Sequence, residues 1–221
     1  METKVRDSIF IITEPKEHQQ KCLLTGHYYE EQMLDFIQQN YFVKGLTDKR
    51  KGTFVDIGAC IGNHTLFFSK IADKVIAFEP VEANYQLLLA NIKRNNLENV
   101  ETYKVALGNA SGKIDIFTFG KIDVLASIQA KRAGQEKQRI DIEKLDNYCL
   151  DNVDLIKIDV EGYNIPVLTG AIETLKKNKP NIFIELNPIG ELVKAEKFLL
   201  PLGYKLYPKV FNATPTYLFY I

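Results

Sequence analysis

Short apolar runs alternate with stretches of helical periodicity along most of the chain. Runs at 53–57, 74–78, 100–105, 154–159 and 181–186 have the length and composition of buried strands. Apolar residues recur every three or four positions at 27–41, after 63, and at 82–95, 164–177 and 189–200, which predicts helices. This order of elements predicts an α/β fold, in which helices cover both faces of a doubly wound, mainly parallel sheet.

The two ends of the chain depart from this alternation. Segments 204–207 and 217–221 alternate apolar and polar residues around a turn at 212–215, and they predict a closing antiparallel hairpin. Residues 1–50 hold one short possible strand at 8–13 before the helix at 27–41, so we expect them to cover the sheet. We therefore predict a single globular domain, with a covering segment at 1–50 and the sheet domain at 51–221.

A glycine turn follows the first strand of the predicted sheet, in the run from Asp56 to Asn63. A strand, a glycine turn and a helix bring a ligand against backbone N–H groups and a helix N-terminus. The dinucleotide pattern would need glycines at 58, 60 and 63, where this chain has Gly58, Cys60 and Asn63. Asp56 instead suits a cationic amino group, which S-adenosylmethionine (SAM) has and a pyrophosphate lacks.

A second acidic residue, Glu79, ends the second strand and precedes Pro80. An acid at this strand tip is placed to accept hydrogen bonds from both ribose hydroxyls of a nucleoside. The run from Val55 to Pro80 resembles the SAM site of the FkbM-type methyltransferases, and the run from Ile156 to Gly162 resembles that family's other hallmark. Similar stretches at 179–185 and 214–218 extend the resemblance to roughly residues 26–221.

The resemblance implies the Rossmann-like fold of class I SAM-dependent methyltransferases, with seven strands and a C-terminal antiparallel hairpin. It also implies SAM as the cofactor, held by the glycine turn, the strand tips and the loop after the third strand. The expected cofactor-binding residues are Asp56, Gly58, Ala59, Gly62, Asn63, Thr65, Glu79, Ala106, Leu107 and Asp159. Ala106 and Leu107 would meet the adenine through backbone atoms, and the alternative is that they form a plain loop.

Four carboxylates fall at predicted strand ends: Asp56, Glu79, Asp159 and Glu185. Methyl transfer to an alcohol needs a base beside the acceptor, and we expect Asp159 and Glu161 to share this catalytic role, with His64 as a further candidate. Each assignment has a structural alternative, because Asp159 could only cap a helix and His64 could turn into the core. The acids lack a clear metal-ligand spacing, so we expect no metal.

Basic residues gather in the segment 119–139, which does not have the pattern of a crossover helix. Lys121, Lys131, Arg132, Lys137 and Arg139 stand there against Asp123 and Glu136, between strand-like residues at 114–119 and 139–142. We interpret this segment as a flap over the acceptor site, and the alternative is a solvated surface loop.

Composition excludes several classes of protein. The 221 residues carry 28 basic and 28 acidic side chains, and this balance argues against a general nucleic-acid binder. No apolar run approaches the roughly 20 residues of a membrane span, and the N-terminus lacks the apolar core of a signal peptide. Three dispersed cysteines, Cys22, Cys60 and Cys149, are typical of reduced thiols, so we expect a cytoplasmic protein.

The expected function is SAM-dependent O-methyl transfer to a small-molecule or glycan acceptor, at a hydroxyl of a sugar or of a secondary metabolite. The alternatives are methyl transfer to a nitrogen of a protein or small molecule, a SAM-binding interaction module without catalysis, and an NAD-dependent dehydrogenase. The acids at 56, 79, 159 and 161 argue against a non-catalytic module. The missing glycines and the closing hairpin argue against the dehydrogenase. The sequence leaves the acceptor and the oligomeric state open.

Overall fold

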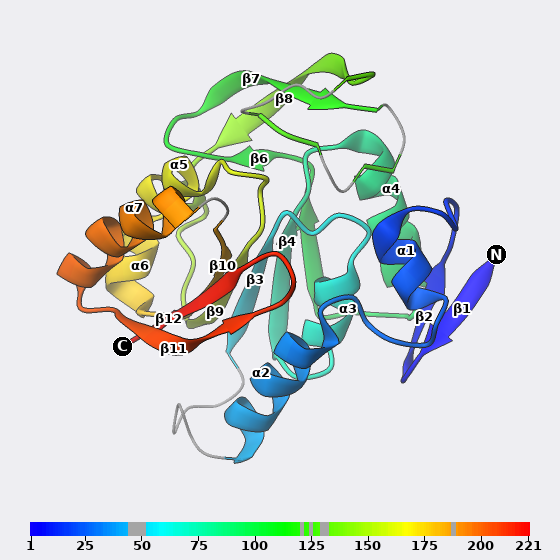
Figure 1. The fold of residues 1–221 in the computed structure, drawn as a ribbon, viewed down its shortest axis with the longest axis horizontal. Coiled ribbons are helices and arrows are strands. Elements are labelled where there is room, and N and C mark those ends of the chain that lie inside the picture. Colours follow the sequence, from blue (N-terminus) through cyan, green and yellow to red (C-terminus); the bar gives the residue numbers. More distant parts are fainter. Residues whose placement is uncertain (44–51, 120–121, 124–125, 129–132, 187–188) are drawn as a thin grey trace.

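The computed structural model describes residues 1–43, 52–119, 122–123, 126–128, 133–186 and 189–221. Within these residues, the centre is a seven-stranded sheet with the order β11-β12-β10-β9-β3-β4-β5 (Figure 1). Its strands are β3 (Thr53–Ile57), β4 (Lys74–Phe78), β5 (Val100–Tyr103), β9 (Val153–Ile158), β10 (Asn181–Glu185), β11 (Lys205–Phe211) and β12 (Thr216–Tyr220). Strand β12 runs antiparallel to both of its neighbours, β10 and β11, and the other neighbouring strands are parallel, which confirms the predicted sheet and its closing hairpin.

Helices bury both faces of the sheet, because successive side chains of a strand point to opposite sides. Residues such as Phe54 and Leu155 share one core with α2 (Glu31–Val43) and α3 (Asn63–Phe68). Residues such as Val55 and Ile156 share the other core with α5 (Asn164–Thr169), α6 (Ile172–Asn178) and α7 (Ile189–Leu199). Figure 1 shows these two groups of helices on opposite sides of the sheet. No helix in the described part of the chain has the length and apolar composition needed to cross a bilayer.

The helix predicted over 164–177 is in fact two helices, α5 and α6, which meet at Gly170 and Ala171. A Cβ atom at Gly170 would lie 1.8 Å from the carbonyl oxygen of Gly108. Only glycine therefore allows these two backbones to approach, and the contact fixes the loop after Leu107 against the helix pair. This break was invisible to periodicity, because the apolar positions continue in register across it.

A three-stranded sheet lies beyond the carboxyl ends of the central strands (Figure 1). It consists of β6 (Ala106–Leu107), β7 (Gly112–Thr118) and β8 (Glu136–Glu143), in the order β6-β8-β7. Strand β8 takes up the end of the segment predicted as a flap, and there Lys137 and Arg139 lie 2.7 and 3.0 Å from carboxylate oxygens of Asp115. Lys121, Lys131 and Arg132 lie outside the described residues, so the flap stays a prediction.

The N-terminal segment packs against α4 (Glu82–Arg94) and α3. It contains the hairpin of β1 (Glu2–Val5) and β2 (Ser8–Ile11), the unpredicted helix α1 (His18–Leu23), and α2, which begins at Glu31 rather than near 27. Two asparagines at the end of α4 hold β2. Asn95, which caps the helix, exchanges two 2.7 Å hydrogen bonds with the backbone of Ile9, and Asn91 within the helix accepts one of 2.8 Å from the Ile11 N–H. The division at residue 50 stays a prediction, but residues on both sides of it share one core.

We expect Asn91→Ala to lower the free energy of unfolding by about 1–3 kcal/mol, because the Ile11 N–H and the Ile61 carbonyl would both lose their buried partner. Urea unfolding followed by circular dichroism measures this change. Lys93→Ala, on the exposed side of the same helix, is the matched control and should change stability by less than about 0.5 kcal/mol. Equal stabilities of the two variants would show that α4 does not anchor β2.

Candidate active site

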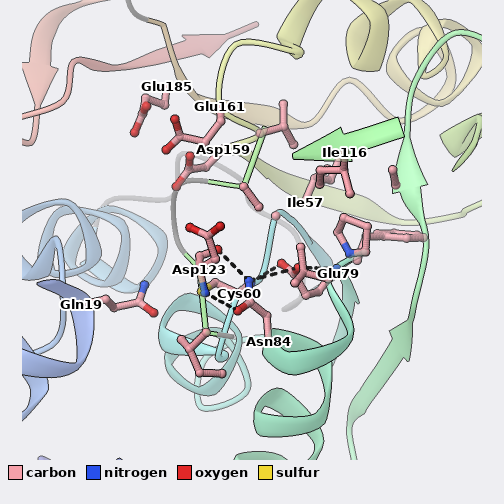
Figure 2. Close-up of a pocket in the computed structure, with 18 of the residues that line it drawn as sticks. Gln19, Ile57, Cys60, Glu79, Asn84, Ile116, Asp123, Asp159, Glu161 and Glu185 are labelled. Atoms are coloured by element: carbon pink, nitrogen blue, oxygen red, sulfur yellow. Dashed lines mark hydrogen bonds between the residues drawn. The ribbon is translucent and has the colours of Figure 1, made fainter. Parts of the chain in front are cut away.

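A cavity of about 680 Å³ opens at the carboxyl ends of β3, β4, β9 and β10. Its wall combines residues after those strands with residues of the three-stranded sheet and of the N-terminal segment. In Figure 2, Asp159, Glu161 and Glu185 lie on one side of it, and Cys60, Asn84 and Glu79 lie on another. The volume is sufficient for a nucleoside-sized ligand together with a small acceptor.

The glycine turn is shaped by its own backbone contacts. Gly58 and Gly62 have φ angles of 81° and 93°, which favour glycine. A Cβ at Gly58 would lie 1.8 Å from the carbonyl oxygen of Asp159, so the turn packs directly on the end of β9. The N–H groups of Gly58 and Ala59 both donate to the carbonyl of Phe78 at 3.0 Å. Of the three expected turn residues, Gly58 lines the cavity, whereas Ala59 and Gly62 do not.

Asp56 does not line the cavity, which corrects the expectation that it faces a ligand amino group. It is fully buried beneath the turn, where Oδ2 accepts a 2.6 Å hydrogen bond from the Thr65 hydroxyl. Its other oxygen lies 3.7 Å from the ammonium nitrogen of Lys157. The charge of Asp56 is thus met by a cation of the protein itself, and Thr65, also expected at the cofactor, serves Asp56 instead.

Lys157 is the buried cation at the centre of this arrangement. Its ammonium donates to the Gly58 carbonyl and to Asp159 Oδ2, both at 3.3 Å, and lies beside Asp56. Burial by itself would lower the pKa of Lys157, but Asp159, Asp56 and Glu30 outweigh it and raise that pKa. Lys157 therefore stays charged and ties the turn to the end of β9.

Asn63 and His64 face the N-terminal segment rather than the cavity. Asn63 exchanges two 2.9 Å hydrogen bonds with the backbone of Tyr29. His64 is 2 % exposed, and its Nε2 lies 3.0 Å from an oxygen of Glu30. Neither residue lines the cavity, so the structure does not support His64 as the base or Asn63 as a cofactor contact. Their contacts instead place Tyr29 in the cavity wall.

Glu79 lies in the cavity wall as expected, and is 4 % exposed. One carboxylate oxygen accepts a 2.8 Å hydrogen bond from the Cys60 N–H, and the other accepts one of the same length from the Val81 N–H (Figure 2). Burial raises the pKa of Glu79 to about 7, although these hydrogen bonds oppose the shift. Asn84 donates to Glu79 at 3.4 Å and exchanges hydrogen bonds with the backbone of Asp123.

Three carboxylates, of Asp159, Glu161 and Glu185, meet at the opposite wall, each offering an oxygen within 4.8 Å of the others. Glu161 has a φ of 48° and Gly162 one of 91°, so the chain turns sharply after β9. Burial, with the charges of Asp159 and Glu161, raises the pKa of Glu185 to about 9. Glu185 is therefore largely protonated at neutral pH. Asp159 and Glu161 are the other two carboxyl groups of this wall.

The apolar wall of the cavity comes from the loop after β5 and from β7. Ala106 and Leu107, expected near the adenine, are buried and line the cavity with Val105 and Ile116. They form the short strand β6 rather than a plain loop, because they pair with Ile142 and Glu143 of β8.

Several polar residues of the cavity wall were not among the expected site residues, and Gln19, Asn84, Lys157 and Glu185 are examples. The sequence could have indicated a role for Lys157, since a lysine inside an apolar strand must find a buried partner. Glu185 was recognised as a strand-end acid but given no role. Gln19 carried no signal, because nothing in its local sequence shows that its helix reaches the glycine turn.

We expect Lys157→Met to lower the free energy of unfolding by about 3–5 kcal/mol at pH 7, because Asp56 would remain charged and buried without its cation. Adding Asp56→Asn should recover part of this loss, since the orphaned charge is then gone. Denaturant unfolding of the two variants measures both values. Lys176→Met, which breaks an exposed pair with Glu173, should cost less than about 1 kcal/mol. A similarly small cost for Lys157→Met would contradict the assignment.

The raised pKa of Glu79 predicts a pH-dependent stability. The native carboxyl keeps its proton up to about pH 7, whereas the unfolded one releases it near 4.5, so stability falls as pH rises between these values. Across this pH range, the shifted pKa of Glu79 should lower the free energy of unfolding by about 3 kcal/mol. We expect Glu79→Gln to lack this part of the decline in unfolding experiments between pH 4.5 and 8. Because Glu185 adds a decline of the same sign in both proteins, the difference between them isolates Glu79. Parallel pH profiles would disprove the shift.

Comparisons with known proteins identify the family. The model of the family described as "Methyltransferase FkbM domain" matches residues 56–206, from Asp56 in β3 to β11. "Methyltransferase 1" of Beauveria bassiana is 23 % identical over 195 residues, covering 76 % of this chain and 78 % of that protein. "Methyltransferase sdnD" of Sordaria araneosa is 24 % identical over 189 residues, covering 69 % of this chain and 73 % of that protein.

Solved structures agree on the fold. A methyltransferase FkbM from Methylobacillus flagellatus superposes with a TM-score of 0.63 at 20 % identity, covering 83 % of this chain. The present chain spans only 47 % of the length of that protein. The family match covers most of the chain and includes both the glycine turn and the acidic wall of the cavity. The chain therefore belongs to the FkbM methyltransferase family and is a SAM-dependent methyltransferase.

Proposed function

We propose that the protein transfers a methyl group to a hydroxyl of a sugar in a glycan or of a secondary metabolite. The observation that carries this proposal is the pair Asp159 and Glu161, whose carboxylates lie together in the cavity that also contains Glu79. Zero net charge supports an acceptor other than a nucleic acid. The free cysteines of the described residues are consistent with a cytoplasmic location.

The cavity has the chemistry that SAM requires. Glu79 is a buried acceptor fixed by two backbone N–H groups, and it would hold the ribose hydroxyls. The apolar surface of Val105, Ala106 and Leu107 would take the adenine, and Gly58 and Asp159 line the part left for the methionine end. When bound, SAM supplies a methyl group on a positively charged sulfur, which needs no further activation.

The protein's part in the reaction is to position the acceptor hydroxyl and remove its proton. Asp159 is oriented by the Lys157 ammonium at 3.3 Å, and Glu161 follows two residues later at the same wall. A hydroxyl bound between them can lose its proton to either carboxylate as the new bond forms. Glu185, largely protonated at neutral pH, can donate a hydrogen bond to another acceptor oxygen. The N-terminal segment contributes Tyr29 and Gln19 to the cavity wall, where they would limit the access of water to the reacting groups.

Methyl transfer to nitrogen is the second candidate, and one observation favours it. The acidic wall that contains Asp159 and Glu161 attracts a cationic group, and amines bind as ammonium ions before they lose a proton. A screen with methyl-labelled SAM against sugars, hydroxylated metabolites and amines, followed by assignment of the labelled atom, separates the two.

With the acceptor found in this way, we expect Asp159→Asn to reduce turnover by about 100- to 10,000-fold, because the variant keeps the size of the side chain but removes a base. Its affinity for S-adenosylhomocysteine (SAH), the demethylated product, should stay near that of the wild type. Glu161→Gln belongs in the same experiment, because coupled carboxylates can share the proton.

The Glu79→Ala variant tests cofactor binding instead of proton removal. It should weaken SAH binding by about 1–3 kcal/mol, because the ribose hydroxyls lose a charged acceptor. His64→Ala tests the discarded base, and any effect on turnover should follow its effect on stability. Near-normal turnover of both carboxylate variants, with a specific loss in His64→Ala, would move the base to the histidine.

A further inference from the structure

Gln19 stands out in the cavity wall because its side-chain oxygen has no partner. The residue is 6 % exposed and lines the cavity, and among the described residues no donor reaches its Oε1. Its backbone N–H donates to Glu17 at 2.8 Å, which fixes the start of α1 and the position of Gln19. A buried carbonyl oxygen without a hydrogen bond is unfavourable, and such atoms usually have a partner in the functional state.

The neighbouring Gln20 shows the structural use of the same side chain. Its Oε1 accepts hydrogen bonds from the Thr13 and Glu14 N–H groups at 2.8 and 3.0 Å, so it holds the chain that leads into α1. Its amide nitrogen lacks a partner among the described residues, but Gln20 does not line the cavity. Only Gln19 of the two combines an unpaired polar atom with a place in the cavity wall.

The position of Gln19 indicates which hydrogen-bond donor of SAM it would bind, an inference that rests on the proposed function. SAM offers ribose hydroxyls, an adenine amino group and the ammonium of its methionine end. Glu79 accounts for the hydroxyls, and the apolar wall at Val105 to Leu107 for the adenine. Figure 2 shows Gln19 entering from α1 on the side of Cys60 opposite to Glu79, which is away from the ribose position.

The ammonium group lacks the partner that the sequence suggested. Asp56 is buried beneath the turn and bound to Thr65 and Lys157, and the Gly58 carbonyl accepts from Lys157 as well. We propose that Gln19 Oε1 accepts a hydrogen bond from the ammonium of the methionine end of SAM, so that the N-terminal segment completes the cofactor site. Gln19 is then a cofactor-binding residue, and α1 is a part of the site rather than a cover.

Calorimetric titration with SAH and with 5′-methylthioadenosine tests this proposal, because the second compound keeps the nucleoside and lacks the amino-acid end. We expect Gln19→Leu to weaken SAH binding by roughly 10- to 100-fold, the loss of one hydrogen bond to a charged group. Its affinity for 5′-methylthioadenosine should be unchanged. The thermal midpoint of the ligand-free variant should be equal to or above that of the wild type, because an unpaired buried oxygen is replaced by an apolar group.

The Gln19→Glu variant tests whether residue 19 binds the ammonium or the carboxylate group of the methionine end. It keeps an acceptor oxygen and adds a complementary charge, so it should bind SAH more tightly than Gln19→Leu does. Gln86→Leu, in the exposed part of α4 where the amide bonds to Glu82, is the matched control and should change neither affinity nor midpoint.

Three results would overturn the proposal. These are unchanged SAH affinity of Gln19→Leu, an equal loss for both compounds with a lowered midpoint, or a Gln19→Glu variant that binds SAH less well than Gln19→Leu. Wild-type protein that binds neither compound would instead show that the proposed SAM site itself is wrong, and the role of Gln19 with it.

Discussion

The buried ammonium of Lys157 is the interaction on which the site depends. Asp56 and Lys157 are direct neighbours across the parallel strands β3 and β9, so the register of the sheet brings their charges together. A lysine that is 3 % exposed can stay charged only with such partners, and here Asp56, Asp159 and the Gly58 carbonyl surround it. One cation thus fixes the glycine turn, and with it Cys60 and Glu79, relative to the acidic wall.

This arrangement gives the polar residues of the site different roles. Asp56 and Thr65 stabilise the turn from below, whereas Glu79 and Asp159 face the cavity. The N-terminal segment is part of the same site, because Asn63 forms hydrogen bonds with the backbone of Tyr29 and His64 lies against Glu30. Residues 1–43 therefore form part of the cavity wall, although the strands that carry the rest of the site all come later in the chain.

The sequence predicted the fold and the strand-end acids well, because buried parallel strands are continuous apolar runs and their tips converge on one edge. It predicted the direction of individual side chains poorly. All five residues of β3 and all six of α3 are buried, so no polar face shows which way Asp56 or His64 points. Gln19 and the break at Gly170 depend on contacts with residues far along the chain, which local pattern does not contain.

A crystal structure of the protein with SAH tests the central claim, that the cavity between Glu79 and Asp159 is the SAM site. We expect both ribose hydroxyls within hydrogen-bonding distance of the Glu79 carboxylate, the adenine against Ala106 and Leu107, and the sulfur facing the wall of Asp159 and Glu161. Asp56 should remain bound to Thr65 and Lys157, without contact to the ligand. SAH bound with its ribose away from Glu79, or with its ammonium on an exposed Asp56, would contradict this assignment of the site.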